Sequence, residues 1–310
     1  MATRETAGTM RDEAAGTPRE QAEGTPREQA AGTLREQAAG TAPPVLLTIA
    51  GSDSGGGAGI QADLKTFAAL GAYGTAAVTA VTAQNPAGVS AMQSIEPALV
   101  AEQIRQVARY FPIAAAKTGM LFSAAIVNAV ADVFAELPRR PPLVVDPVMV
   151  ATSGAKLLQD DAVAALCARI LPLATVITPN MDEAALLLGR PLAGREHLER
   201  AARDLHARFG TAVLVKGGHL TGSAEAADCL FDGRAAHWTV HPFVRGVNAH
   251  GTGCTLSAAI AAGLGFGLPL AQAVARAREY LQAGLVAAVR AGPERLLNHA
   301  HAPRSMPRGR

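Results

Sequence analysis

The chain has 310 residues, of which 49% are hydrophobic and 17% charged, and its formal net charge is +2. That length and apolar content suffice for one large core, so a second domain is not required. So small a net charge argues against the basic surface typical of nucleic-acid-binding proteins, and only residues 304–310 are locally basic.

The cysteines and the apolar stretches limit where the protein works. Cys167, Cys229 and Cys254 show no CxxC spacing, which argues against a disulfide framework or a zinc site and indicates a reducing compartment. The N-terminus lacks the apolar core of a signal peptide, and no uninterrupted apolar stretch is long enough to span a membrane. We therefore expect a cytoplasmic protein that binds neither membranes nor nucleic acid.

Residues 7–38 consist of four eight-residue repeats, three of which share the core Gly-Thr-Xaa-Arg-Glu-Gln-Ala. These repeats contain almost no large apolar side chains, and each includes a Gly-Thr pair that interrupts a helix, so they cannot build a core. We expect residues 1–42 to be a disordered extension. A partner-binding tail or a chain of short helices is the alternative.

From residue 45 onward, strand-like and helix-like segments alternate. An apolar run over residues 45–50 predicts a strand, residues 58–70 a helix, and the Val- and Thr-rich residues 74–83 a second strand. Further strands are expected at residues 113–117, 143–146, 175–178 and 212–216, with an edge hairpin formed by 228–232 and 236–240. Further helices are expected at residues 97–110, 123–137, 160–171, 195–209, 252–264 and 271–288.

This alternation predicts an α/β fold with a mostly parallel sheet that helices cover on both faces. The domain would span residues 43–292, and residues 293–310 would form a flexible basic tail. In such sheets, ligands bind beyond the carboxyl ends of the strands. Glycine or polar residues follow most of the predicted strands, at 51–53, 84–85, 118–120, 146, 178–180 and 216–218. We expect these residues to converge on one crevice.

Residues 248–256 form a loop that opens a predicted Ala-rich helix. The first N–H groups of a helix lack partners and carry the positive end of its dipole, so Gly251, Thr252, Gly253 and Cys254 could present donors to a phosphoryl oxygen. A helix N-terminus lowers the pKa of a thiol, which makes Cys254 a candidate proton acceptor or a polar neighbour of a substrate hydroxyl. His250 is an alternative base. The segment predicts phosphoryl transfer.

A glycine-rich loop, residues 55–59, follows the first strand and resembles a nucleotide-binding loop. The second strand ends without the acidic residue that a dinucleotide site uses for the ribose, and the chain has no P-loop motif. Dinucleotide binding is therefore disfavoured, and a plain glycine turn remains an alternative.

Three polar residues at other strand ends extend the expected phosphate site. Lys216, followed by two glycines, could neutralise nucleotide phosphates, although lysines at strand ends are often only solvated. Asn180 and Glu183 have the spacing of a helix cap. Alternatively, Glu183 and Asp146 would organise Mg²⁺ through water molecules.

Eight ordered blocks together carry a resemblance that is far more specific than any single motif. They lie at residues 50–53, 56–66, 82–85, 117–120, 146–149, 178–183, 216–219 and 250–257. Over residues 45–288 the chain resembles the ribokinase-like vitamin kinases, and most closely the hydroxymethylpyrimidine/phosphomethylpyrimidine kinases of thiamine biosynthesis. Gly55, Thr118 and Ala249 depart from the residues that are common in that family, but none of them is a proposed catalytic group.

The resemblance implies a three-layer αβα ribokinase-like fold with a central, mostly parallel sheet, a homodimer, and the use of ATP with Mg²⁺. It implies two successive phosphorylations: of the hydroxymethyl group of 4-amino-5-hydroxymethyl-2-methylpyrimidine, and then of the monophosphate to the pyrophosphate. A pyridoxal kinase of the same superfamily is the nearest alternative. A ligand-sensing protein that has kept the fold without turnover is a second one.

The resemblance also implies roles for individual residues. The pyrimidine would be bound by Gln84, whose amide suits the aminopyrimidine edge, and by Gly51, Asp63 and Met120. The nucleotide would be bound by Asn180, Lys216, Gly217 and Thr252, and the metal by Asp146 and Glu183. The catalytic groups would be Cys254, Gly251, Gly253 and Lys216, with Cys254 at the position where many relatives carry an aspartate base.

Overall fold

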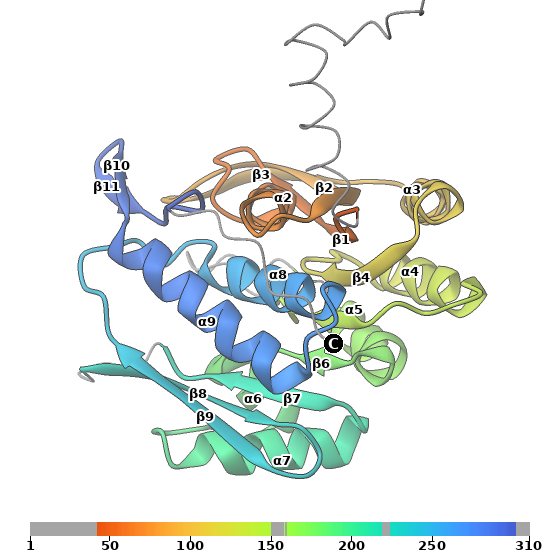
Figure 1. The fold of residues 1–310 in the computed structure, drawn as a ribbon. Coiled ribbons are helices and arrows are strands. Elements are labelled where there is room, and N and C mark those ends of the chain that lie inside the picture. Colours follow the sequence, from red (N-terminus) through yellow and green to blue (C-terminus); the bar gives the residue numbers. More distant parts are fainter. Residues whose placement is uncertain (1–41, 150–157, 159, 219–223, 302–310) are drawn as a thin grey trace, which may run out of the picture. The chain divides into compact units, whose positions relative to one another are not determined.

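The structure is a computed structural model that describes residues 42–149, 158, 160–218 and 224–301 (Figure 1). The described residues from 43 onward make up one compact unit. The repeats of residues 7–38, and with them nearly all of the expected extension, lie outside the described residues, as do residues 302–310 of the expected tail. No helix in the described part is long and apolar enough to cross a membrane.

One sheet dominates the described residues, with nine strands in the order β3-β2-β1-β4-β5-β6-β7-β8-β9. The strands are β1 (Val45–Asp53), β2 (Tyr73–Asn85), β3 (Gly88–Ser94), β4 (Ile113–Thr118), β5 (Leu143–Val145), β6 (Val176–Ile177), β7 (Ala212–Lys216), β8 (Glu225–Phe231) and β9 (Ala236–Pro242). Strands β2, β1, β4, β5, β6 and β7 pair in parallel, whereas β3 is antiparallel to β2, and β8 is antiparallel to both β7 and β9. The mostly parallel sheet and the edge hairpin are confirmed.

Helices cover both faces of this sheet. One face carries α3 (Pro97–Tyr110), α4 (Ala124–Glu136), α5 (Asp160–Ala165), α6 (Met181–Leu188) and α7 (His197–Phe209). The other face carries α2 (Gly59–Ala69), α8 (Thr252–Gly265) and α9 (Leu270–Val286). The three-layer αβα architecture is therefore as expected.

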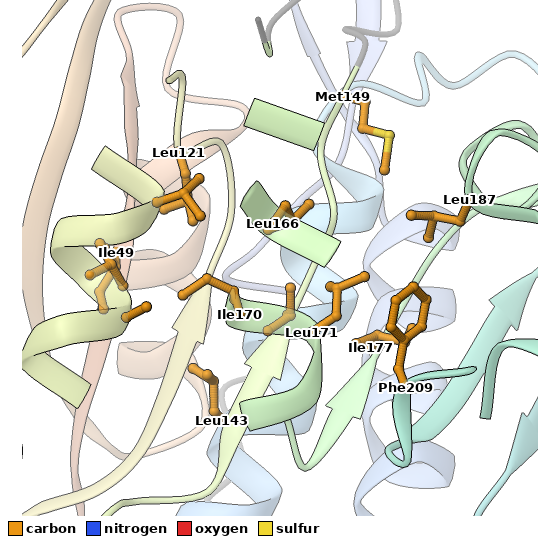
Figure 2. Close-up of a cluster of buried hydrophobic side chains, with 14 of the residues drawn as sticks. Ile49, Leu121, Leu143, Met149, Leu166, Ile170, Leu171, Ile177, Leu187 and Phe209 are labelled. Atoms are coloured by element: carbon orange, nitrogen blue, oxygen red, sulfur yellow. The ribbon is translucent and has the colours of Figure 1, made fainter. Parts of the chain in front are cut away.

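The strands contribute alternate side chains to the two cores, as the period of two in a strand requires. Leu46 packs with α2, α8 and α9, whereas its neighbour Leu47 packs on the opposite face. Val144 and Val145 divide in the same way. Figure 2 shows one of these cores, in which Ile177 of β6 lies near Leu171. Because both faces of the sheet are buried, the carboxyl ends of its strands are held in fixed positions.

Two elements differ from the expected ones in the middle of the chain. Strand β2 continues to Asn85 and turns back into β3, which was not predicted. The helix expected over residues 160–171 is α5 followed by a π-helical turn (Leu166–Ile170) and a 3-10 turn (Leu171–Leu173). Pro172 explains this change, because its ring lacks an N–H group and collides with the preceding turn of an α-helix.

The boundary expected at residue 292 is too early. Strand β10 (Val289–Ala291) pairs with β11 (Glu294–Leu296), and Leu297 and His299 beyond it are buried. These strands are short, and their residues show no apolar periodicity, which is why the sequence pattern did not predict them. The packed domain therefore continues to residue 299 at least.

Candidate active site

The candidate site lies where the strand order reverses between β1 and β4, which is where open α/β sheets bind ligands. Gly51 of β1 and Met120, just after β4, meet at this point. A Cβ atom on Gly51 would lie 2.4 Å from Cε of Met120, so a larger residue at this position would displace the end of the methionine side chain. Two residues expected to bind the pyrimidine are thus brought together.

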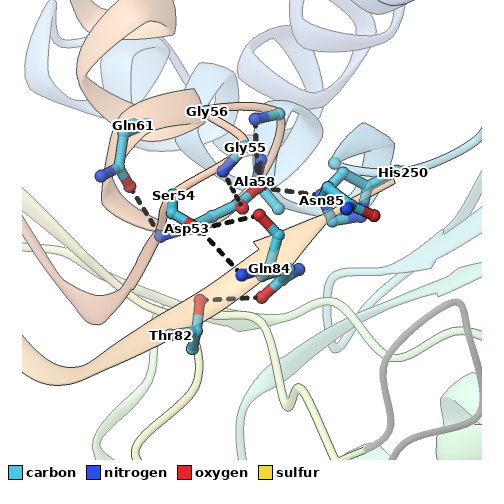
Figure 3. Close-up of polar contacts among 12 residues, drawn as sticks. Asp53, Ser54, Gly55, Gly56, Ala58, Gln61, Thr82, Gln84, Asn85 and His250 are labelled. Atoms are coloured by element: carbon cyan, nitrogen blue, oxygen red, sulfur yellow. Dashed lines mark hydrogen bonds and ion pairs between the residues drawn. The ribbon is translucent and has the colours of Figure 1, made fainter. Parts of the chain in front are cut away.

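Asp53, at the end of β1, organises the glycine-rich turn before α2 (Figure 3). Its Oδ1 accepts a hydrogen bond from the N–H of Gly55 (2.8 Å), and its Oδ2 accepts from those of Gly57 (3.0 Å) and Ala58 (2.8 Å). Oδ2 also lies 2.8 Å from Nε2 of His250, in the loop before α8. Burial alone would raise the pKa of Asp53, but His250 and the backbone donors outweigh it and lower that pKa. Asp53 therefore holds one ring nitrogen of His250 and fixes the orientation of its ring.

Gln84, near the end of β2, lies beside the same turn (Figure 3). Its backbone N–H donates to Ser54 Oγ (2.8 Å), and Ser54 Oγ donates to the Gln84 carbonyl (2.7 Å). Its side-chain Oε1 lies 3.1 Å from Thr82 Oγ1, whose hydroxyl also donates to the Ser52 carbonyl at 2.9 Å. Within the described residues its Nε2 group donates to no protein acceptor, so it can donate to a ligand.

The anion-binding segment, which we define as residues 248–254, packs directly against the glycine-rich turn. Gly251 precedes α8 and has a φ angle of 81°. A Cβ atom on Gly251 would lie only 1.7 Å from the carbonyl oxygen of Gly57. Both the positive φ angle and this backbone contact require glycine at the position.

At the start of α8, the segment has two backbone donors without an acceptor among the described residues. The N–H of Thr252 donates to the carbonyl of Ala249 at 3.1 Å, so it is not available to a ligand. The N–H groups of Gly253 and Cys254, in the first turn of α8, have no backbone acceptor among the described residues. Gly253 and Cys254, rather than Thr252, are therefore the residues of this turn whose N–H groups are available to an anion.

Cys254 is half-buried, and its pKa moves opposite to the expected direction. Burial raises the pKa of the thiol to about 11, although the Lys117 ammonium group acts to lower it. The expectation from a helix N-terminus alone was therefore wrong, because it left out the loss of hydration and the nearby carboxylates of Asp63 and Asp146. At neutral pH Cys254 is a neutral thiol, which can orient a hydroxyl group but is a poor proton acceptor.

Lys216, at the end of β7, brings a cation to the start of α8. Its Nζ lies 2.8 Å from Oδ1 of Asp146, which also accepts from Thr178 Oγ1 at 3.2 Å. A Cβ atom on Gly253 would lie 3.2 Å from this Nζ, so the ammonium group is next to the unpaired donors. By contrast, the N–H of Gly217 already donates to Ala227 and to Asp228 inside the protein. Gly217 therefore has no backbone donor left for a nucleotide.

Asn180 and Glu183 form a reciprocal cap on α6, which confirms the helix-cap alternative. Asn180 Oδ1 accepts from the Glu183 N–H, and Glu183 Oε2 accepts from the Asn180 N–H, both at 2.8 Å. Burial raises the pKa of Glu183 to about 7, with Lys216 lowering it and Asp146 raising it. Asn180 also pairs with Lys216 through a β-bridge, so the cap lies beside the lysine.

Asp63 differs from its expected place on the wall of the substrate pocket. It is fully buried, and its carboxylate accepts from Lys117 Nζ at 2.9 and 3.0 Å and from Thr48 Oγ1 at 2.5 Å. Burial raises the pKa of Asp63 although Lys117 acts to lower it. Asp63 is engaged in this ion pair, and none of its surface is exposed to a ligand in this structure.

Asp146 and Glu183, the two carboxylates near Lys216, would suit a metal ion that is bound through water molecules. Within the described residues, no three His, Cys, Asp or Glu side chains group closely enough to hold a metal ion by themselves. Asp146 and Glu183 both act on the charge of Lys216. Two carboxylates beside an ammonium group would suit a Mg²⁺ ion that keeps several waters and is bound mainly through a nucleotide.

Two polar residues important to this geometry, Asp53 and His299, were not predicted as site residues. An aspartate shortly before consecutive glycines is typical of a turn that its carboxylate closes, and this signal could have identified Asp53. His299, whose Nε2 lies 3.0 Å from Thr255 Oγ1, has no local motif that marks it.

Comparisons with known proteins agree with this geometry. A family model described as phosphomethylpyrimidine kinase matches residues 53–299. A hydroxymethylpyrimidine/phosphomethylpyrimidine kinase of Rhizobium meliloti is 51% identical over 247 residues, which is 79% of this chain and 92% of the relative. The matched range of the family model contains the Asp53 turn, Lys216 and the whole anion-binding segment.

Solved structures give the same result for the fold. The crystal structure of a phosphomethylpyrimidine kinase from Clostridium difficile superposes with a TM-score of 0.67 at 38% identity, over 77% of this chain and 97% of the other. A pyridoxal kinase of Bacillus subtilis, solved as an ADP complex, superposes with a TM-score of 0.77 at 34% identity, over 84% of this chain and 98% of the other. The expected ribokinase-like fold is confirmed.

Proposed function

Because the chain belongs to the phosphomethylpyrimidine kinase family, we propose that it phosphorylates 4-amino-5-hydroxymethyl-2-methylpyrimidine and then its monophosphate, using ATP, in thiamine diphosphate biosynthesis. The observation that carries this proposal is the pair of unpaired N–H groups on Gly253 and Cys254 beside the Lys216 ammonium group. Two donors and a cation at a helix N-terminus suit the oxygens of a polyphosphate.

Catalysis would come from positioning and electrostatics, as is usual for phosphoryl transfer. Lys216 and the N–H groups of Gly253 and Cys254 bind the oxygens of the transferring phosphoryl group, which stabilises the charge in the transition state. Gly251 shapes this turn, and Asn180 keeps Lys216 in place through their bridge. Thr252 shapes the segment through its turn with Ala249. Its N–H group donates to the Ala249 carbonyl and therefore does not bind the nucleotide.

The pyrimidine would bind at the strand ends next to this phosphate site. The free Nε2 group of Gln84 donates to the ring edge, and Gly51 and Met120 provide the surface beneath the ring. Asp63 acts indirectly, by neutralising Lys117 under the site. Cys254, as a neutral thiol, orients the acceptor hydroxyl toward the phosphoryl group.

When bound together with ATP, Mg²⁺ would neutralise part of the negative charge of the phosphates. Asp146 and Glu183 would hold it through water molecules, because Asp146 Oδ1 is engaged by Lys216 and Glu183 Oε2 caps α6. The homodimer implied by the family resemblance is also part of this proposal, and light scattering on the purified protein would test it.

Phosphorylation of pyridoxal is a second candidate function. The likeness to the Bacillus subtilis pyridoxal kinase favours it, because that structure superposes with a higher TM-score than the phosphomethylpyrimidine kinase does, at a lower sequence identity. Pyridoxal also carries a hydroxymethyl group on a six-membered nitrogen ring, so the same phosphate site could serve it.

Mass spectrometry of the products tests the assignment. The purified protein is incubated with Mg-ATP and, separately, with the hydroxymethylpyrimidine, its monophosphate and pyridoxal. Pyrimidine pyrophosphate from both pyrimidine substrates is the expected result. Pyridoxal phosphate alone would move the assignment to the second candidate, and no product from any substrate would favour a ligand-sensing protein.

A further inference from the structure

The segment after α9 follows the last of the eight sequence blocks, and it contacts the phosphate site. The hairpin β10–β11 lies beyond the end of α9 (Figure 1), and the residues after it contact α9 again. Asn298 N–H donates to the carbonyl of Gly284 at 3.3 Å, and a Cβ atom on Gly284 would lie 2.9 Å from the Asn298 carbonyl oxygen. Tyr280 Oη donates to the His299 carbonyl at 2.5 Å. The segment is thus fitted closely to α9.

The hairpin holds the beginning of the anion-binding segment. The backbone N–H of Asn248 donates to the carbonyl of Arg295 at 2.8 Å, and its side-chain Nδ2 donates to Glu294 Oε2 at 2.6 Å. The Oδ1 of Asn248 accepts from the N–H of His250 at 2.8 Å. The residue that leads into the phosphate-binding turn is therefore fixed by three hydrogen bonds, two of which come from the hairpin.

His299 holds the other end of this turn. Its Nε2 lies 3.0 Å from Oγ1 of Thr255, and the same Oγ1 lies 2.8 Å from the carbonyl oxygen of Gly251. Thr255 N–H also donates to that carbonyl, at 2.9 Å. The contact from His299 therefore reaches, through one side chain, the glycine that starts α8.

The direction of these hydrogen bonds follows from the single proton of the threonine hydroxyl. A helical threonine donates this proton to the carbonyl four residues earlier, which here is Gly251. The ring of His299 must then donate from Nε2–H to Oγ1, so it is a neutral ring with its proton on Nε2. Burial keeps the ring neutral, since it lowers the pKa of His299 to about 4.

We propose that residues 294–299, which we call the C-terminal clamp, position the anion-binding segment, and that His299 is a positioning residue for the ATP phosphates, acting through Thr255 on Gly251. The backbone contact between Gly251 and Gly57 leaves little tolerance, so a small movement of this turn redirects the N–H groups of Gly253 and Cys254. The clamp rests on the proposed function only in taking ATP as the ligand.

The test measures binding of a non-hydrolysable ATP analogue by calorimetry, together with the KM values for ATP and for the pyrimidine. Replacement His299→Ala removes the ring and should weaken analogue binding and raise the ATP KM by about five- to tenfold, the effect of one lost hydrogen bond. The pyrimidine KM should stay the same. Replacement His299→Gln keeps an N–H donor of similar reach and should restore most of the affinity.

Two further variants make the result unambiguous. Thr255→Val removes the same contact from the other side and should weaken ATP binding as His299→Ala does, which keeps the test available if His299→Ala fails to fold. His206→Ala is the matched control: the His206 ring likewise makes one hydrogen bond, to the carbonyl of Thr211, and it contacts Phe231 edge to face, away from the site. It should lower the melting temperature without changing the ATP affinity.

The proposal is overturned if His299→Ala binds the analogue as tightly as wild type, if His299→Gln is as weak as His299→Ala, or if His206→Ala weakens ATP binding equally. Analogue binding needs no acceptor substrate. Failure to phosphorylate the pyrimidine would therefore count against the proposed function and leave the result on the clamp unaffected.

Discussion

Among single residues, Cys254 is the one whose chemistry the structure changes most. Its sulfur lies at the start of α8, but it is half-buried and close to both Lys117 and two carboxylates, and burial raises the pKa of its thiol to about 11. A thiol with that pKa is protonated at neutral pH. In the proposed function, its contribution would therefore be to place the acceptor hydroxyl, while Lys216 and the helix donors would stabilise the transferred group.

Replacement Cys254→Ala should accordingly lower kcat by about 10- to 100-fold, with little change in the KM for ATP, because orientation is lost and phosphate binding is kept. The pH profile between pH 6 and 9 should keep its shape, since the thiol does not titrate there. Cys254→Ser keeps a donor of similar reach and should retain most of the turnover. Steady-state kinetics check this, and full turnover in Cys254→Ala would deny the thiol any role.

Thr118 carries a buried hydroxyl that has no hydrogen-bond partner among the described residues. Replacement Thr118→Val removes this unpaired group at nearly constant volume, and it should stabilise the protein by about 1 kcal/mol. Thr178→Val is the matched control, because that equally buried hydroxyl donates to Asp146 and its loss should destabilise. Urea denaturation of both variants checks the signs, and a destabilised Thr118→Val would mean that the hydroxyl has a partner after all.

The pair Asp63–Lys117 is completely buried, so removing one partner leaves the other as an uncompensated charge. Replacement Lys117→Met should cost about 3–5 kcal/mol of stability. The double variant Lys117→Met with Asp63→Leu should recover a large part of that loss. Chemical denaturation measures both, and equal stability of Lys117→Met and wild type would contradict the buried ion pair.

At the scale of elements, the sequence patterns predicted the features that depend only on residues close together in the chain. The apolar runs of β1 and β7 marked strands, and the spacing of Asn180 and Glu183 marked the cap of α6. Features that depend on distant partners were not predictable. Asp53 is 197 residues from His250, and Thr255 is 44 residues from His299. No pattern within a window of one element reports such contacts.

The raised pKa of Cys254 belongs to the same class. A helix N-terminus is visible in the sequence, but the burial that reverses its effect arises only when α2, β4 and α8 come together. Asp63 is similar: its motif identified it, whereas the fully buried partner Lys117 determines what it can contact. In both cases the sequence identified the residue but not the buried surroundings that determine its chemistry.

The C-terminal clamp gives a pH dependence of stability at the scale of an element. The pKa of His299 falls from its ordinary 6.5 to about 4 through burial, with Lys65 and His301 acting in the same direction. Below pH 6.5, His299 takes up a proton in the unfolded chain but stays neutral in the folded protein until the pH approaches 4. The free energy of unfolding therefore decreases as the pH falls toward 4. Between pH 7 and pH 5 this loss should be about 2 kcal/mol.

Urea denaturation of wild type and of His299→Gln at both pH values checks this dependence. The variant cannot take up the proton, so its stability should fall less over the same interval. An identical loss in the two proteins would show that other groups are responsible.

For the molecule as a whole, the site belongs to no single motif. The glycine-rich turn after β1, the cation at the end of β7 and the first turn of α8 meet because the parallel sheet delivers all its carboxyl ends to one edge. The Asp53–His250 contact and the C-terminal clamp then fix the loops relative to one another. The fold therefore brings the proposed phosphate-binding groups next to the strand ends at which the pyrimidine is proposed to bind.

The measurement that tests this account most directly is a ³¹P NMR time course of the purified protein with Mg-ATP and the hydroxymethylpyrimidine in one tube. The monophosphate signal should rise and then fall as the pyrophosphate appears, with two ADP formed for each pyrimidine pyrophosphate. An ATP signal that stays constant, or ATP consumption without any phosphorylated pyrimidine, would contradict the assignment.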